Sequence, residues 1–314
     1  MPELPDLVAY IEALRRHIVG RRLDRLLLSS PFVLRSVDPP LESIFGSVAT
    51  AIDRIGKRLV LTFAGGTGRK TPEGTAREAD RDRFLVIHLM IAGRLRWRPA
   101  GAAKKGPGVS PKLVLAAFEF EHGTLFFTEA SSKKRASMQM AAGTAAVRAL
   151  DPGGIEPLEV TREQFDAALT RESHTVKRAL TDPHLFSGIG NAYSDEILHA
   201  ARLSPLQLTR SLTAEERARL FESTRATLTA WIDRLREEAA GGFPDKVTAF
   251  RPEMAVHGRF RKPCPVCGTP VQRIVYAANE CNYCARCQTG GRLLADRSLS
   301  RLLRDDWPRS IDEL

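Results

Sequence analysis

The stretch "CPVCGTPVQRIVYAANECNYCARC", residues 264–287, determines how the last part of this chain folds. Cys264 and Cys267 form one Cys-x2-Cys pair, and Cys284 and Cys287 form a second pair sixteen residues further on. This spacing is typical of zinc sites. Four thiolates complete a tetrahedral site and leave no open position, so we expect one structural Zn²⁺.

The fifth cysteine, Cys281, lies inside the same stretch and offers "CNYC" as an alternative second pair. The sixteen-residue spacing favours the outer pair, so we interpret Cys281 as a packed or spare thiol. A segment of about 40 residues can hardly build a core alone, and the metal substitutes for one. All five cysteines of the chain lie between residues 264 and 287. Such a cluster favours metal binding over disulfide bonds.

Before this stretch, the chain is helical from a linker-like "LDPGGIEPL" near residue 150 to about residue 240. Short helices are expected over 161–172, 175–182 and 191–203, with "GIG" at 188–190 as a break. Thr213 and Glu216 have the spacing of a capping box, which predicts the start of a long helix that continues past Trp231.

The region from about 23 to 145 has the pattern of short strands separated by turns. The runs that indicate strands are "RLLLSS", "RLVLTF", "RFLVIHLMI", "RLRWRP", "LVLAAFEF" and "GTLFFTE". They predict a β-sandwich or a flattened barrel. Two polar, glycine-rich insertions, 64–83 and 99–112, are expected to be mobile surface loops.

The chain begins "MPELPDLVAY", and an apolar stripe follows. We expect Asp6 to cap a helix that starts just after Pro5 and stops near Gly20, because its apolar residues share one face. These residues are Leu7, Tyr10, Ile11, Leu14 and Ile18. Removal of Met1 would leave Pro2 as a secondary amine beside Glu3. This terminus is either an ordinary frayed end or a nucleophile.

Composition narrows the class of partner. The net charge of +10 favours polyanions, nucleic acid first and acidic membrane surfaces second. No apolar run approaches the ~18 residues of a membrane span, and the first residues lack a signal-peptide pattern. We therefore expect a cytoplasmic protein with no membrane partner.

Three features now occur in order: "PELP" at 2–5, "LFSGIGNAYSDEIL" at 185–198 and the four-cysteine stretch. Together they resemble the formamidopyrimidine-DNA glycosylase and endonuclease VIII family of bacterial base-excision repair, over roughly residues 2–290. The resemblance implies an α+β multidomain fold. Its parts would be an N-terminal β-sandwich with a leading helix (2–148), a helix-two-turn-helix domain (149–250), a zinc ribbon (251–290) and a C-terminal extension (291–314).

The resemblance also implies an activity, a DNA glycosylase with abasic-site lyase activity that acts on damaged DNA as a monomer. Pro2 matches the family's nucleophile, and Glu3 matches its general acid/base. Lys57 matches a catalytic-domain lysine that holds a phosphate, and Asn191 matches a phosphate-binding residue at a helix start. Lys177 matches a lysine near the flipped base or the backbone. A terminal amine has a pKa of about 8, so part of it is neutral near pH 7 and can attack C1′.

The residues that would fill the gap left by a flipped base depart from the family pattern. The first loop reads "HLMIAG" and supplies Met90 and Ile91. The second reads "TEASSKKRASMQM", in which Lys133, Lys134 and Arg135 stand where the family has an arginine and a phenylalanine. Without the aromatic wedge, we expect a preference for DNA that is already open: abasic sites, bubbles or single strands.

Three further departures concern the finger, the first helix and the C-terminus. Asn279 stands where the family has a finger arginine, and Asp6 replaces the family's usual glutamate. The extension after Cys287 carries four leucines that suggest a small helix packed on the finger or on a neighbour: Leu293, Leu299, Leu302 and Leu303. Two alternative functions stay open, a lyase-only or non-catalytic DNA-binding protein on this scaffold and an RNA- or ribosome-associated zinc-ribbon factor.

Overall fold

The computed structural model describes residues 1–64, 82–101, 110–244, 247–248, 250–276, 279–295, 301–302 and 308–313. Most of both predicted insertions, residues 65–81 and 102–109, lies outside these ranges, as do Leu299 and Leu303. The chain forms two compact units. The first comprises 1–152 and 232–247, and the second comprises 153–231 and 248–314. Each unit is described by itself.

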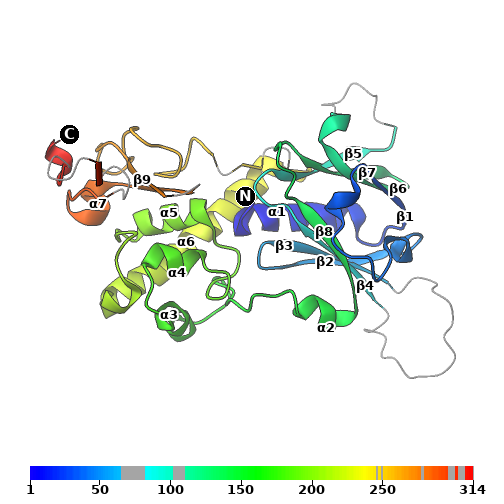
Figure 1. Ribbon diagram of the computed structural model, residues 1–314, viewed down its shortest axis with the longest axis horizontal. Coiled ribbons are helices and arrows are strands. Elements are labelled where there is room, and N and C mark those ends of the chain that lie inside the picture. The colour runs from blue at the N-terminus through cyan, green and yellow to red at the C-terminus, as the bar shows by residue number, and fades with distance from the viewer. Residues whose placement is uncertain are drawn as a thin grey trace. The chain divides into compact units, whose positions relative to one another are not determined.

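The first unit contains two four-stranded antiparallel sheets (Figure 1). One sheet has the order β1-β6-β7-β5 and the other the order β2-β3-β4-β8. The strands are β1 (Leu23–Leu28), β2 (Ala49–Ile55), β3 (Arg58–Phe63), β4 (Arg83–His88), β5 (Gly93–Pro99), β6 (Val114–Phe120), β7 (Gly123–Glu129) and β8 (Ser137–Ala142). One hydrophobic core takes residues from both sheets, which confirms the predicted β-sandwich.

Helix α1 (Leu4–Ile18) contacts one edge strand of each sheet, β5 and β2. The Leu95 N–H of β5 donates to the Tyr10 hydroxyl (3.3 Å), and Arg15 Nε donates to the Ile52 carbonyl of β2 (3.0 Å). The apolar face predicted for this helix is buried in the core. The helix therefore covers backbone groups that edge strands otherwise leave open, and it holds the N-terminus beside the sandwich.

The remaining helices of the first unit are short. They are α2 (Gly143–Arg148) and the 3-10 turns η1 (Pro31–Val33), η2 (Leu41–Ile44) and η4 (Pro111–Leu113). The last turns of α6 also belong to this unit, because the boundary between the units falls after Trp231, inside that helix.

The second unit contains the predicted helices and the cysteine-rich segment. Its helices are α3 (Arg162–Thr170), α4 (Val176–Thr181), α5 (Asn191–Ala200), most of α6 (Ala214–Ala239) and α7 (Ala285–Thr289), with 3-10 turns η5 (Thr209–Ser211) and η7 (Ile311–Glu313). The capping box at the start of α6 is confirmed: the Thr213 N–H donates to Glu216 Oε2 (3.0 Å), and the Glu216 N–H donates to Thr213 Oγ1 (3.2 Å).

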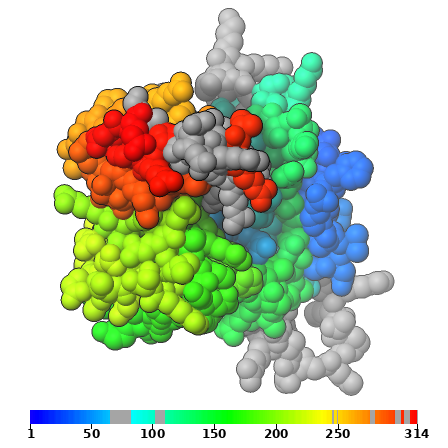
Figure 2. Space-filling view, turned by 60° about the vertical axis from the view of Figure 1, so that its left-hand side comes forward, coloured from blue at the N-terminus to red at the C-terminus, as the bar shows by residue number. Residues whose placement is uncertain are grey.

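A two-stranded sheet, β9 (Gln272–Tyr276) with β10 (Asn279–Tyr283), follows the helices in the second unit. Strand β10 lies against α5, and Figure 2 shows the orange finger segment packed on the yellow-green helical segment of this unit. Within the described ranges, no helix is both long enough and apolar enough to span a membrane.

Candidate active site and metal centre

The N-terminal residues enter α1 in a restrained conformation. Pro2 and Glu3 are buried, and Glu3 is the N-cap of the helix. The Glu3 N–H donates to Asp6 Oδ2 (3.0 Å), as in a capping box. The expectation that Asp6 is itself the cap is therefore wrong. Asp6 is the third residue of the helix, in its first turn, and its short carboxylate reaches back to Glu3, the residue before the helix.

Four charged groups act on the amine at this terminus. Burial lowers the pKa of the Met1 amine, the carboxylates of Glu3 and Asp6 raise it, and the cations Arg94 and Lys57 lower it. Burial likewise lowers the pKa of Lys57, against the opposing effect of Glu3. The amine of Met1 is thus influenced by Lys57, which the resemblance singled out as a phosphate-binding lysine, and by Arg94, which the sequence did not indicate.

Lys57 lies in the two-residue turn between β2 and β3, half-buried. The first turn residue, Gly56, has φ 54°, a conformation that hairpin turns of this length require and glycine adopts without strain. The next residue, Arg58, pairs with His88 of β4. Burial, with the charges of Arg58 and Lys57, lowers the pKa of His88 to about 4, so this imidazole is neutral at pH 7.

Two loops were expected to fill the gap that a flipped base leaves in DNA, and both lie at the same end of the sandwich. Each connects one sheet to the other, residues 89–92 between β4 and β5 and residues 130–136 between β7 and β8. They start and end at paired residues, because His88 pairs with Ser137 and Gly93 pairs with Glu129. The strand register therefore places the two loops beside each other.

The first of these loops is tightly closed. The Gly93 N–H donates to the Leu89 carbonyl (2.8 Å), and a Cβ at residue 93 would lie 2.2 Å from that oxygen. Met90 has φ 51°, an uncommon conformation for a residue with a side chain. Ile91 follows with 63% of its surface exposed, a large apolar side chain facing water.

The second loop is anchored by a carboxylate that the sequence did not single out. Glu129 is 2% exposed and accepts from the backbone N–H groups of Arg135 (3.0 Å) and Ala136 (3.2 Å). The Lys134 ammonium donates to the Glu129 carbonyl. Lys133, Lys134 and Arg135 are exposed, so three cations stand on a loop with a fixed base.

In the second unit, Asn191 is the first residue of α5, and Gly190 is its N-cap. The Asn191 side-chain amide donates to the Glu280 carbonyl of β10 (2.8 Å). Lys177 is 4% exposed, and its ammonium donates to Asn191 O (3.1 Å), Ser194 Oγ (3.0 Å) and Asp195 Oδ1 (2.5 Å). Its charge is therefore directed at the start of α5 rather than at solvent.

Two neighbouring acids of α5, Asp195 and Glu196, connect this helix to β10 of the finger and to residues 255–257. Asp195 Oδ2 accepts from the Asn282 N–H (3.1 Å) and contacts His257 Nδ1 (2.8 Å). The carboxylate of Glu196 accepts from the backbone N–H groups of 255, 256 and 257 at 2.7–2.9 Å. Burial raises the pKa of Glu196, and these three hydrogen bonds oppose that effect.

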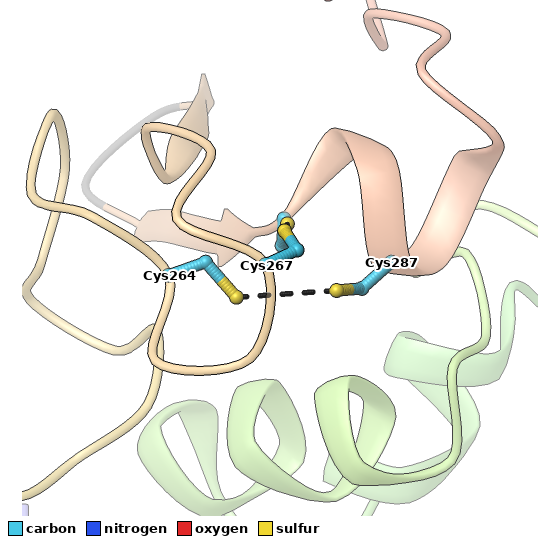
Figure 3. A group of neighbouring side chains, drawn as sticks. Cys264, Cys267 and Cys287 are labelled. Carbon is cyan, nitrogen blue, oxygen red and sulfur yellow. Dashed lines mark hydrogen bonds between the residues drawn. The ribbon is translucent and has the colours of Figure 1, made fainter.

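The four predicted zinc ligands form one cluster. The Sγ atoms of Cys264, Cys267, Cys284 and Cys287 all lie within 4.8 Å of one another. Figure 3 shows the labelled side chains converging from the loop at 264–267 and from α7. The closest pairs are Cys267 with Cys284 (3.4 Å) and Cys264 with Cys287 (3.9 Å). An all-thiolate set of this kind fits a structural Zn²⁺.

Cys281 lies apart from this cluster, as predicted. It is 1% exposed in β10 and belongs to a small hydrophobic core of the finger. The extension contributes Leu293, Leu294 and Ile311 to the same core. The Leu294 N–H also donates to the Tyr283 hydroxyl (2.8 Å). Of the four leucines expected in an extension helix, Leu293 packs on the finger outside any helix, and Leu302 is 77% exposed.

A sandwich with a leading helix, a helical segment and a four-cysteine finger define the class of zinc-finger DNA repair glycosylases. Three family models match this chain. They describe a formamidopyrimidine-DNA glycosylase N-terminal domain (residues 1–135), a formamidopyrimidine-DNA glycosylase H2TH domain (154–238) and a zinc finger found in FPG and IleRS (261–290).

Relatives give the same result at full length. The formamidopyrimidine-DNA glycosylase of Thermus thermophilus is 30% identical over 297 residues, which cover 93% of this chain and all of that protein. The chain therefore belongs to the formamidopyrimidine-DNA glycosylase family. An uncharacterised formamidopyrimidine-DNA glycosylase-like protein of Mycobacterium tuberculosis is 38% identical over 163 residues, 52% of this chain and 99% of that protein.

Solved structures show the same fold. The crystal structure of the MutM (Fpg) protein of Thermus thermophilus superposes with a TM-score of 0.71 at 29% identity, over 91% of this chain and 98% of that one. A Lactococcus lactis Fpg (MutM) complex with DNA containing an oxidised pyrimidine gives 0.74 at 23% identity, over 92% of this chain and 100% of that one.

Proposed function

We propose that this protein is a base-excision-repair DNA glycosylase with abasic-site lyase activity, and that the amine of Pro2, freed by removal of Met1, is its nucleophile. The observation that carries the proposal is the set of charged groups at the start of the chain, where Pro2 and Glu3 are buried and where Glu3, Lys57 and Arg94 all act on the amine of Met1. Titratable groups with shifted pKa values that share one site are typical of active sites.

The chemistry needs an amine that is neutral and an acid beside it. Burial and the cations of Arg94 and Lys57 lower the pKa of the Met1 amine. The same surroundings would raise the neutral fraction of a Pro2 amine at pH 7. The amine nitrogen attacks C1′ of the damaged nucleotide, the base leaves, and an iminium forms between the enzyme and the opened sugar. Glu3 protonates the ribose oxygen as the ring opens and later transfers protons during strand cleavage.

Residues near the terminus and at the start of α5 would hold the DNA backbone. Lys57 and the neutral imidazole of His88 supply a charge and a donor to a phosphate next to the lesion. Asn191 and the N-terminal amides of α5 bind a second phosphate. Because Lys177 is hydrogen-bonded to Asn191 O, we assign it to the positioning of this helix start rather than to direct contact with DNA.

The loops support a preference for DNA that is already open. Neither residues 89–92 nor residues 130–136 contain an aromatic ring. Extraction of a base from intact duplex costs a few kcal/mol, which stacking side chains normally offset. Cations bind the backbone of an exposed strand but stack poorly, with Arg135 the best of the three. Because the aromatic wedge and the finger arginine of the family are both missing, we also expect this protein to discriminate weakly between bases opposite the lesion.

Borohydride trapping on abasic-site DNA tests the mechanism. Wild-type protein should give a covalent adduct that mass spectrometry places on a peptide beginning with Pro2, and its intact mass should lack Met1. Pro2→Leu, in which a large second residue retains the methionine, should give none. Lys112→Gln removes an exposed amine of the same unit and should trap like the wild type.

A Met1-bearing protein that cleaves, or an adduct on an internal lysine, would refute the role of Pro2. Binding to abasic DNA without any adduct would favour the non-catalytic alternative.

The substrate preference is tested by cleavage of abasic sites, 8-oxoguanine and oxidised pyrimidines, each in duplex and in bubble DNA. Cleavage of abasic sites without base release indicates a lyase-only enzyme. Strong cleavage of 8-oxoguanine in intact duplex, with a sharp preference for cytosine opposite, contradicts the open-DNA proposal.

A further inference from the structure

We propose that His199 is a positioning residue of the zinc centre, whose Nε2–H donates a hydrogen bond to the thiolate of Cys264 and so couples helix α5 to the metal. The inference concerns a residue outside the four ligands and outside the proposed chemistry at the N-terminus. It rests on a contact between the last turn of α5 and the first cysteine of the finger.

The contact is short and buried. His199 Nε2 lies 3.3 Å from Cys264 Sγ, and the two residues are 6% and 3% exposed. A cysteine that binds zinc is a thiolate and has no proton to donate. The imidazole nitrogen must therefore be the donor, which assigns the tautomer of His199 as Nε2–H.

The bond completes a series of contacts along α5. At its first residue, Asn191 donates to the Glu280 carbonyl of β10 (2.8 Å). One turn later, Asp195 and Glu196 accept backbone N–H groups of β10 and of the segment before the finger. His199 adds the metal ligand itself at the last turn. The finger thus contacts this helix from its first residue to its end.

The physical effect of the bond is on the ligand. Four thiolates around one Zn²⁺ leave net negative charge on the sulfurs, and a donor aimed at one sulfur stabilises that charge. It also restrains the Cys264 side chain in its ligating position. Partners of this kind commonly change metal affinity by about 10–100-fold when they are removed.

Two variants separate the hydrogen bond from packing. His199→Gln keeps an N–H donor near the position of Nε2 but replaces the ring. His199→Phe keeps a ring of similar volume but has no donor. His184→Gln, at an exposed histidine of the same unit, is the matched control. The measurement is the rate at which zinc-loaded full-length protein transfers its metal to a chromophoric chelator.

We expect His199→Phe to release zinc about 10-fold faster or more, and His199→Gln and His184→Gln to stay near the wild-type rate. The reverse order, with His199→Gln fast and His199→Phe unchanged, would make His199 a packing residue and overturn the proposal. Equal rates for all four proteins would overturn it as well. Neither outcome depends on whether the protein cleaves DNA.

A second measurement needs no variant and so stays decisive if His199→Phe does not fold. In wild-type protein loaded with ¹¹³Cd, NMR should detect a scalar coupling between the metal and the imidazole Hε2 across the N–H···S bond. A His199 ring in the Nδ1–H tautomer, without that coupling, would refute the proposed donor.

Discussion

Glu3 contributes both to the fold and to the proposed chemistry. Its backbone begins α1 through the bond to Asp6, and its charge acts on the terminal amine and on Lys57. A loose N-terminus would place an amine and a carboxylate in many relative positions. Because the first helical turn starts at the next residue, Glu3 is held by the same capping box that stabilises the helix.

Lys57→Gln should weaken DNA binding through the loss of one phosphate contact. The slope of log K against log salt should then fall by about 0.9, while abasic-site cleavage slows. Lys112→Gln removes an exposed lysine of the same unit and should leave the slope near the wild-type value. Equal slopes for the two variants would show that Lys57 does not neutralise a phosphate.

In the His88→Gln variant, the free energy of unfolding should depend less on pH below pH 6.5 than it does in the wild type. The folded pKa of about 4 lies below the ordinary value of 6.5, so the unfolded chain binds a proton first as the pH falls. The contribution of His88 to the stability of the wild-type protein is therefore complete above pH 6.5 and is lost as the pH falls to about 4. A shift of this size corresponds to a loss of about 3 kcal/mol in the free energy of unfolding. Denaturant unfolding at several pH values measures it, with His184→Gln as the control. A parallel loss in His88→Gln would assign the effect to other groups.

Among the secondary-structure elements, the sequence predicted the leading helix and six of the eight sandwich strands. It missed β2 and β8. The segment "ATAIDRI" of β2 mixes small and charged residues, and "SMQMAA" of β8 has no β-branched or aromatic residue. Pairing with neighbouring strands stabilises these segments although their own strand propensity is low. All of β8 pairs with β4, and Met138 and Met140 are buried.

Glu129→Ala should destabilise the first unit, because the N–H groups of Arg135 and Ala136 lose a charged acceptor. A loss of about 2 kcal/mol is expected in the free energy of unfolding. Glu129→Gln keeps one acceptor oxygen and should lose less. Glu121→Ala, at an exposed acid in the turn before β7, should change little. If both Glu129 variants unfolded like the wild type, the carboxylate would not anchor the loop.

For the molecule as a whole, we expect the four-cysteine cluster to hold the finger in its folded form when it binds Zn²⁺. Cys284→Ser should abolish stoichiometric zinc and weaken DNA binding, since a three-cysteine set leaves the site open. Cys281→Ser should retain one zinc per chain, because Cys281 lies in the finger core rather than in the cluster. Metal analysis of both proteins checks this. Loss of zinc from Cys281→Ser would reassign the ligands.

The parts of the site that the sequence could not supply depend on long-range pairing. The cysteine spacing was enough to choose the four residues that cluster in the structure. The terminal motif and the family resemblance suggested Pro2, Glu3 and Lys57, whose roles stay predictions. His88 was missed because only the strand register pairs it with Arg58, next to Lys57. Arg94 was missed because its effect on the terminal amine depends on residues far apart in the sequence. The buried partners of Lys177 were missed for a similar reason. The helical pattern of the sequence does not show that the ammonium group of Lys177 contacts Asp195 on another helix.

The two loops that cross between the sheets have a consequence for how such a protein can be modified. Their ends are set by the pairs His88–Ser137 and Gly93–Glu129, which belong to the sandwich and not to the loops. Residues 130–135 could therefore be replaced together by those of a relative, provided that Glu129 is kept to accept the backbone N–H groups of residues 135 and 136. Such an exchange would change the cations of this loop while the strand pairs that hold its ends stay as they are.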